Sequence, residues 1–419
     1  MSEMIYGVHD KPNWRETLLF SIQMVLAVFV ASVLIANIVG VSASAALVGA
    51  GIGTLAYVLL TKAGSPMFIS SSGAFVAPCL AAMAIGGSAG LSLGGVVSCL
   101  IYCLFGLAFF KISPEKIYKV LPKALIGAIT CVIGINLMPF CLTYVQIAGT
   151  TNIVGVGIAL FTMFVIALIS HYAKGVAKIL PFLLGTLAGY AVAAVITLTG
   201  IYPVVDFSVF QNPRLFAVPE MAFMSWNGLS WTAVASIVVS YVVYTISASC
   251  ECLSDHAVLG NIINEDLYQN PGLGRIFCGT GVANLLNGAI SGLGSCSYGE
   301  SVATIGFSRV ASVRITIVSA LMMILLGFFG PIQAFIASIP SCVFCGAALI
   351  LYSYIAMSGV KTLKQVDLEN QKNLLVASVA LSLGVSGLAI GGTVFSLSGV
   401  ALAVIVGIVL NFVLKDKEA

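Results

Sequence analysis

Three acidic residues fall inside apolar segments of this sequence, where a charged group is costly. Of the fifteen Asp and Glu residues, Glu251, Asp255 and Glu300 lie in such segments, and we place the others in loops or tails. An ionised carboxylate at the centre of a bilayer costs on the order of 3 kcal/mol even by lenient insertion scales. Because no Lys or Arg lies at comparable depth, each carboxylate needs a proton or a polar partner.

The spacing of these residues indicates a shared site for a neutral polar solute. Glu251 and Asp255 are four apart and share one helical face, whereas His256 is rotated away and is expected to pack. A carboxylate accepts N–H bonds from a planar amide or imide, and a protonated one also donates. Carboxylates that are close together in a low dielectric tend to hold a proton, so proton uptake and solute binding could be linked. The alternative for Glu251, Asp255 or Glu300 is a structural hydrogen bond to a neighbouring helix.

Two segments rich in serine and glycine are placed to present backbone groups to that solute. They are MFISSSGAFVAP, residues 67–78, and GLGSCSYGESVA, residues 292–303. Ser and Gly permit extended backbone, and exposed backbone at membrane depth is tolerated only inside protein or beside a watery cavity. Gly and Ser at ordinary helix contacts are the alternative.

The composition identifies the elements that carry these residues as membrane spans. The chain has 419 residues, 60% hydrophobic and 8% charged, whereas soluble domains carry roughly a quarter charged residues. We expect an all-α membrane protein with fourteen transmembrane segments. The candidate spans are 15–39, 44–61, 66–86, 90–111, 120–140, 152–170, 176–200, 229–258, 273–290, 293–309, 312–330, 333–355, 372–390 and 395–414.

The basic residues support this count, because loops facing the cytoplasm are enriched in Lys and Arg. With the N-terminus inside, fourteen spans place seventeen of the eighteen basic residues inside and leave only Arg214 outside. Those inside are Lys11, Arg15, Lys62, Lys111, Lys116, Lys119, Lys123, Lys174, Lys178, Arg275, Arg309, Arg314, Lys361, Lys364, Lys372, Lys415 and Lys417. We therefore expect a multi-pass protein of the cell membrane with both termini cytoplasmic.

The chain divides at a long loop rich in Pro and aromatic residues. Residues 1–200 would form a first repeat of seven spans, 201–228 an extracellular connection, and 229–419 a second repeat of seven spans. An odd number of spans per half inverts the second half, the 7+7 plan of many secondary transporters, whose sites lie on interrupted helices.

The cysteines and the start of the chain suggest no other chemistry. Cys342 and Cys345 form a CxxC inside an apolar run without a second pair. We expect no metal, no cofactor, no structural disulfide and no cleavable signal peptide.

Several motifs resemble the nucleobase–cation symporter (nucleobase–ascorbate transporter) family, most closely its bacterial uracil permeases. They are GVHDKP…SIQ near the start, ISSSGAFVAP, the stretch 251–261 followed by IINEDLYQNPGLGR, SYGES, and the late LLVASVALSLGVSG. The resemblance implies a 7+7 inverted repeat with short antiparallel strands in the third and tenth spans. It also implies core and gate domains that interleave both repeats.

The resemblance also implies roles for individual residues. Glu251 and Glu300 would hold the base, helped by backbone amides at Gly73 and Gly299, with the ring of Tyr298 nearby. Ser72 belongs to the same segment and is included in the binding site. Asp255, together with Glu251, would take part in proton coupling.

The sequence also departs from the family pattern. Ser301 stands in a signature that loses its Asn, Gly and Thr, and Met24 replaces the usual His of the first span. Glu300 and Thr280 resemble pyrimidine carriers. Gly73, where an aromatic is usual, and Asp255 lean the other way, since a smaller residue could admit a larger ring.

We therefore predict a secondary transporter, not an enzyme, that imports a nucleobase by proton symport with alternating access. Uracil is the preferred solute, and a purine such as xanthine is the alternative. An anion carrier of the same fold, for sulfate, bicarbonate or borate, and a channel or membrane enzyme are the other hypotheses. The partners expected are the nucleobase, H⁺ or else Na⁺, and the lipid bilayer, without nucleic acid; a homodimer is one option for assembly.

Overall fold

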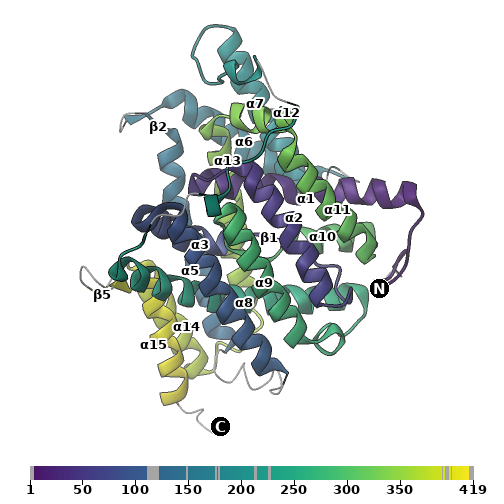
Figure 1. The fold of residues 1–419 in the computed structure, drawn as a ribbon. Coiled ribbons are helices and arrows are strands. Elements are labelled where there is room, and N and C mark those ends of the chain that lie inside the picture. Colours follow the sequence, from purple (N-terminus) through teal and green to yellow (C-terminus); the bar gives the residue numbers. More distant parts are fainter. Residues whose placement is uncertain are drawn as a thin grey trace.

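The computed structural model describes residues 4–110, 122–147, 150–174, 177, 180–211, 215–224, 228–388, 390–391, 396–397 and 399–414. These residues are mostly helical (Figure 1). The first half contains α1 (Trp14–Val39), α2 (Ala43–Leu60), β1 (Ile69–Ser71), η1 (Gly73–Phe75), α3 (Val76–Phe109), α5 (Lys123–Leu137), η2 (Met138–Val145), β2 (Gln146–Ile147), β3 (Thr150–Thr151), α6 (Ile153–Tyr172), α7 (Pro181–Leu198), η4 (Ser208–Phe210) and η5 (Ala222–Met224). The second half contains α8 (Trp231–Ile263), η6 (Tyr268–Gly272), α9 (Leu273–Ser291), β4 (Ser295–Ser297), α10 (Gly299–Ser308), α11 (Val313–Phe328), α12 (Gly330–Ser338), α13 (Ser341–Leu363), α14 (Gln371–Val385), β5 (Ile390–Gly391), β6 (Ser396–Leu397) and α15 (Gly399–Val413).

Long apolar helices make this a membrane-spanning architecture. Within the described residues, seven helices are long and apolar enough to cross a bilayer, and four shorter apolar helices accompany them. Described basic residues stand at helix ends, as Lys62 does after α2 and Arg275 does in the first turn of α9. Seven residues used in the charge argument lie outside the described residues: Lys111, Lys116, Lys119, Lys178, Arg214, Lys415 and Lys417.

Three expected spans have different boundaries in the structure, each for a backbone reason. The third and fourth spans join in α3, which is interrupted at Gly87 with φ of 55° and ψ of −144°, a conformation open to glycine. The span expected at 333–355 is instead divided between α12 and α13. Pro340 explains the division, because proline has no N–H and holds the preceding Ile339 in an extended conformation.

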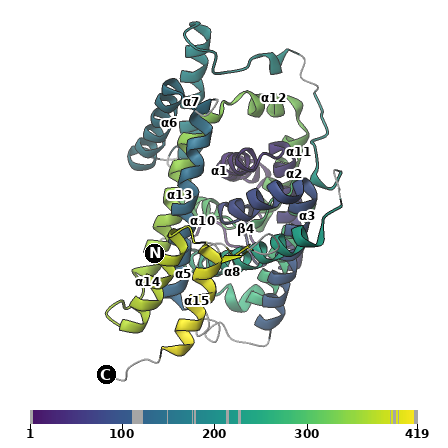
Figure 2. The ribbon, with the colours of Figure 1, turned by 90° about the vertical axis from the view of Figure 1, so that its left-hand side faces the viewer.

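The helices pack as two groups that each draw on both halves of the chain. In the first group, α1, α2, α3, α8, α9, α10 and α11 surround β1 and β4; in the second, α5, α6, α7, α13, α14 and α15 pack together. Figure 2 shows the two groups side by side, with α12 crossing between them at the top. Within the first group, α3 and α9 approach so closely that a Cβ on Gly95 would lie 2.8 Å from the Cα of Gly288.

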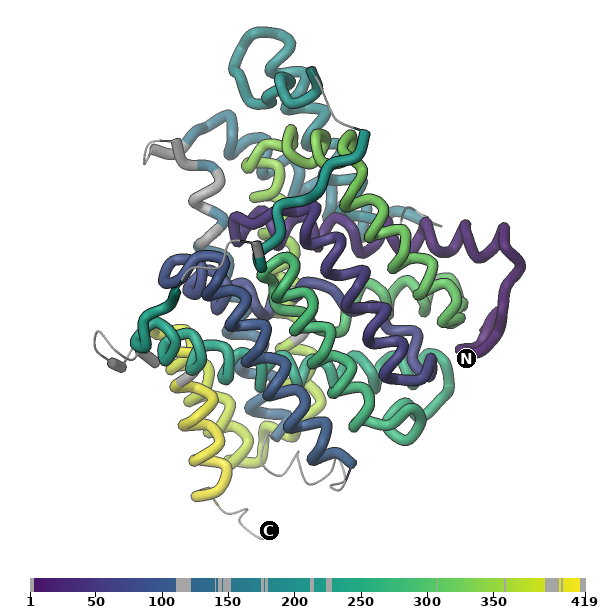
Figure 3. Tube along the Cα trace, in the orientation of Figure 1, coloured from purple at the N-terminus to yellow at the C-terminus, as the bar shows by residue number. Residues whose placement is uncertain are grey.

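The segment before α1 is attached to the connection between α10 and α11. Tyr6 forms a parallel bridge with Val310, and the Ser312 hydroxyl donates to the Asp10 carbonyl at 2.6 Å. Figure 3 traces this segment, in purple, at the edge of the molecule where it meets these helices. The N-terminal motif therefore supports the C-terminal end of α10.

Candidate functional site

The two serine-rich segments form a short two-stranded ladder in the middle of the first helix group. β1 and β4 pair antiparallel, with Ile69 opposite Ser297 and Ser71 opposite Ser295. This confirms the strands implied in the third and tenth spans. Because the strands are antiparallel, η1 and α3 leave one end of the ladder and α10 leaves the other.

Side chains from two neighbouring helices satisfy the outer edges of this ladder. Asn284 on α9 donates to the Ser295 carbonyl at 2.5 Å and accepts from the Ser295 N–H at 2.8 Å. Thr54 on α2 does the same for Ile69, with distances of 2.8 Å to the carbonyl and 3.1 Å to the N–H. Asn287 donates to the Ser295 hydroxyl at 2.7 Å. These contacts allow a two-stranded element to exist at membrane depth, where unpaired backbone groups cost several kcal/mol.

The three predicted carboxylates come together beside the β4 end of the ladder. Glu251 and Asp255 lie one turn apart on α8, and Glu300 lies in the first turn of α10. Glu251 lies within electrostatic range of Asp255 and Glu300, and Asp255 lies within electrostatic range of Glu300. The Ser297 hydroxyl donates to Asp255 Oδ2 at 2.6 Å, so one carboxylate is fixed directly to β4. All three side chains are half-buried.

The predicted backbone groups lie at the starts of the two interrupted helices. Gly73 begins η1 and is partly exposed, while the Ser72 hydroxyl caps η1 by accepting from the Ala74 N–H at 3.2 Å. Gly299 begins α10 and is exposed, and a Cβ there would meet nothing within 4 Å. Tyr298 precedes it, is 5% exposed and interacts with the Ser32 side chain of α1.

This arrangement offers both donors and acceptors to a solute. The first N–H groups of a helix have no partner within the helix and carry partial positive charge, and α10 begins without a side-chain cap. Carboxylates supply the complementary acceptors. The start of α10 and the nearby carboxylates therefore offer groups suited to a neutral molecule with N–H and C=O groups.

The sequence of the whole chain decides which family carries this site. Residues 15–393 match the sequence profile of the permease family. The chain belongs to this family. It is 32% identical over 430 residues to the uracil permease of Bacillus subtilis (strain 168), covering 99% of this chain and 96% of that protein. The resemblance to the nucleobase–ascorbate transporters and their bacterial uracil permeases is thus confirmed, and the protein is a permease rather than an enzyme.

Solved structures share the fold of this permease. The murine Solute Carrier 26 family member A9 anion transporter in its inward-facing state gives a TM-score of 0.69 at 12% identity, covering 96% of this chain and 69% of that one. The transmembrane domain of the cyanobacterial bicarbonate transporter BicA gives 0.64 at 16% identity, covering 97% and 100%. At these identities the likeness concerns architecture alone.

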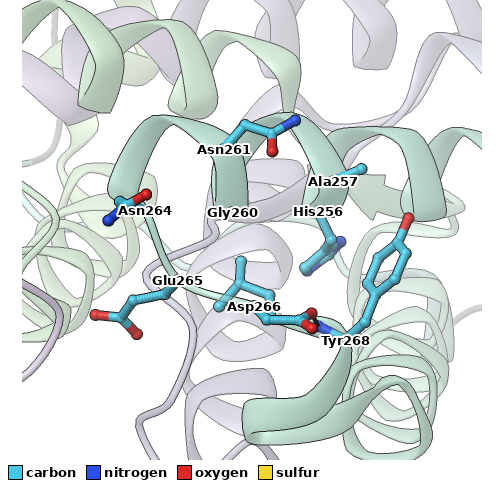
Figure 4. Close-up of a pocket in the computed structure, with 9 residues that line it drawn as sticks. His256, Ala257, Gly260, Asn261, Asn264, Glu265, Asp266 and Tyr268 are labelled. Atoms are coloured by element: carbon cyan, nitrogen blue, oxygen red, sulfur yellow. Dashed lines mark hydrogen bonds between the residues drawn. The ribbon is translucent and has the colours of Figure 1, made fainter. Parts of the chain in front are cut away.

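A cavity lies at the C-terminal end of α8 in this permease. This cavity of about 390 Å³ is lined by residues that include His256, Asn261, Glu265, Asp266 and Tyr268 (Figure 4). None of the predicted site residues lines it, although His256 in its lining is the neighbour of Asp255 in the sequence. His256 is fully buried, with Nε2 2.8 Å from the Tyr57 hydroxyl and Nδ1 2.7 Å from the Cys252 carbonyl.

The departures from the family pattern lie in positions that support the ladder or the core. Ser301 donates to the Tyr298 carbonyl at 2.7 Å and accepts from the Phe68 N–H at 3.4 Å, so it joins α10 to the start of β1. Thr280 is buried and donates to the Ile276 carbonyl of its own helix at 2.9 Å. Met24 is buried on α1.

The sequence prediction did not identify Thr54, Asn284 and Asn287 as supports of the site. A signal for the two asparagines was present, because they stand in the apolar stretch 273–290 and polar side chains in membrane helices usually serve a partner.

Proposed function

We propose that this permease imports a nucleobase, with uracil as the preferred solute, by proton symport. The observation that carries the proposal is the convergence of Glu251, Asp255 and Glu300 beside the starts of two interrupted helices. The uracil permease with which the chain shares 32% identity supports the choice of solute.

In this proposal each group matches one edge of the base. Glu251 and Glu300 accept the ring N–H groups, because ionised carboxylates are strong acceptors. The backbone N–H groups of Gly73 and Gly299 donate to the carbonyl oxygens. Tyr298 packs beside the ring, and Ser72 keeps the first turn of η1 in place.

The coupled ion is assigned to Asp255, with Glu251 as its partner. Asp255 accepts a hydrogen bond from the Ser297 hydroxyl at 2.6 Å and lies within electrostatic range of Glu300. A proton on Asp255 therefore alters both the hydrogen bond to β4 and the environment of a base-binding carboxylate. A proton is the preferred coupling ion, and Na⁺ is the alternative that a sodium gradient would test.

Alternating access is assigned to movement between the two helix groups. The first group, with β1 and β4, corresponds to a core domain that carries the site, and the second corresponds to a gate domain. Each group draws on both halves of the chain, which is the arrangement expected of a 7+7 inverted repeat. In this proposal the protein lies in the cell membrane with both termini cytoplasmic.

Uptake of radiolabelled uracil tests the proposal. Glu251→Gln and Glu300→Ala should each abolish uptake at wild-type levels of membrane insertion. Glu220→Gln, in the exposed connecting loop, is the matched carboxylate control and should transport normally. Normal accumulation by either site variant would show that the site is assigned wrongly. Xanthine uptake in place of uracil would favour the purine alternative, and sulfate- or chloride-dependent flux in proteoliposomes would favour an anion carrier.

A further inference from the structure

The space next to Gly73 is already occupied in the structure. A Cβ added to Gly73 would lie 2.7 Å from Ile355 Cδ1, well inside ordinary van der Waals contact. The room that a small residue leaves at position 73 is therefore bounded by a side chain from another helix. Ile355 fills the direction that a side chain at residue 73 would take.

Ile355 reaches Gly73 from the opposite helix group. It lies on α13, which packs against α5 and α6, whereas Gly73 follows β1 in the first group. Ile355 is half-buried, and Gly73 is partly exposed between the buried residues Ser72 and Ala74. A side chain of the second group therefore lies directly against the start of η1.

Resting on the proposed function, we propose that Ile355 sets the size of the base that this permease accepts. Its branched side chain closes the Gly73 side of the site and restricts it to a single-ring pyrimidine. A purine carries an additional fused imidazole ring, and shortening Ile355 to alanine removes every carbon beyond Cβ. An apolar pocket wall discriminates about 10- to 200-fold between ligands that differ in size. We expect the preference of the wild-type protein for uracil over xanthine to lie in this range.

The test compares uracil and xanthine binding to purified protein by titration calorimetry. Ile355→Ala should raise xanthine affinity at least about tenfold relative to uracil, with uracil affinity changed only a few-fold. Ile350→Ala on the same helix is the matched control and should keep the wild-type ratio.

The outcomes separate this inference from the function on which it rests. If Ile355→Ala elutes as a folded species and binds uracil but keeps the wild-type ratio of xanthine to uracil affinity, Ile355 does not set the size of the site. If the wild-type protein binds neither base, the proposed function fails and this inference fails with it.

Discussion

The amide of Asn284 offers the sharpest test of how the ladder is held in the membrane. Replacing Asn284 with leucine keeps the side-chain size and removes both bonds to Ser295, at 2.5 Å and 2.8 Å. Ser295 is 1% exposed, so water does not replace the lost partner. We expect β4 to lose its position and α10, which follows it, to lose its own.

The magnitude follows from the two backbone groups left without a partner. Each buried unpaired group costs about 1–3 kcal/mol, so the variant should lose about 2–6 kcal/mol of stability. That is a large share of the roughly 5–15 kcal/mol that stabilises a typical folded domain. A loss of this size should lower the midpoint of thermal unfolding in detergent by roughly 2–7 °C, because a chain of 419 residues loses about 1 °C per kcal/mol.

Thermal unfolding of purified variants and uracil binding measure the effect together. Asn37→Leu is the control, because the Asn37 amide donates to the Val33 carbonyl in its own helix at 2.8 Å and holds no strand. It should unfold close to the wild-type temperature. If Asn284→Leu also unfolds at the wild-type temperature and binds uracil normally, Asn284 does not hold β4, and the reasoning about unpaired backbone groups is refuted.

Two further variants test neighbouring contacts. Thr54→Val is nearly isosteric and removes both bonds to Ile69, so by the same arithmetic it should cost about 2–6 kcal/mol in thermal unfolding. Thr54→Ser should keep most of the stability, and equal midpoints for Val and Ser would contradict the role of the hydroxyl. Ser297→Ala removes the donor 2.6 Å from Asp255. Because hydrogen bonds to charged groups contribute about 1.5–3 kcal/mol, uptake should fall about tenfold or more and its pH profile should change, while Ser297→Thr should transport like the wild type. An unchanged pH profile for Ser297→Ala would show that Ser297 takes no part in proton coupling.

The sequence indicated the carboxylates and strands because their signals are local. Serine and glycine runs inside apolar segments predicted extended backbone, and the structure has β1 at Ile69–Ser71 and β4 at Ser295–Ser297. Carboxylates without basic neighbours predicted a shared polar site, and in the structure Glu251 and Asp255 both lie within electrostatic range of Glu300.

What depends on packing between distant segments could not be predicted in the same way. The contact of Ile355 with Gly73 joins residues far apart in the sequence, and one glycine gives no sign of what occupies the space beside it. The partner of Asn284 likewise depends on how α9 lies against β4. The division between α12 and α13 was open to prediction, because Pro340 marks it, but apolar composition alone concealed it.

The proposed binding site consists of three half-buried carboxylates and two helix starts that bind a neutral base. A thermal-shift measurement with uracil on the purified permease at two pH values, beside Glu251→Gln, tests this most directly. We expect uracil to stabilise the wild-type protein strongly and in a pH-dependent way, and to leave the variant unstabilised. Equal stabilisation of both proteins by uracil, or none of the wild type at either pH, would contradict it.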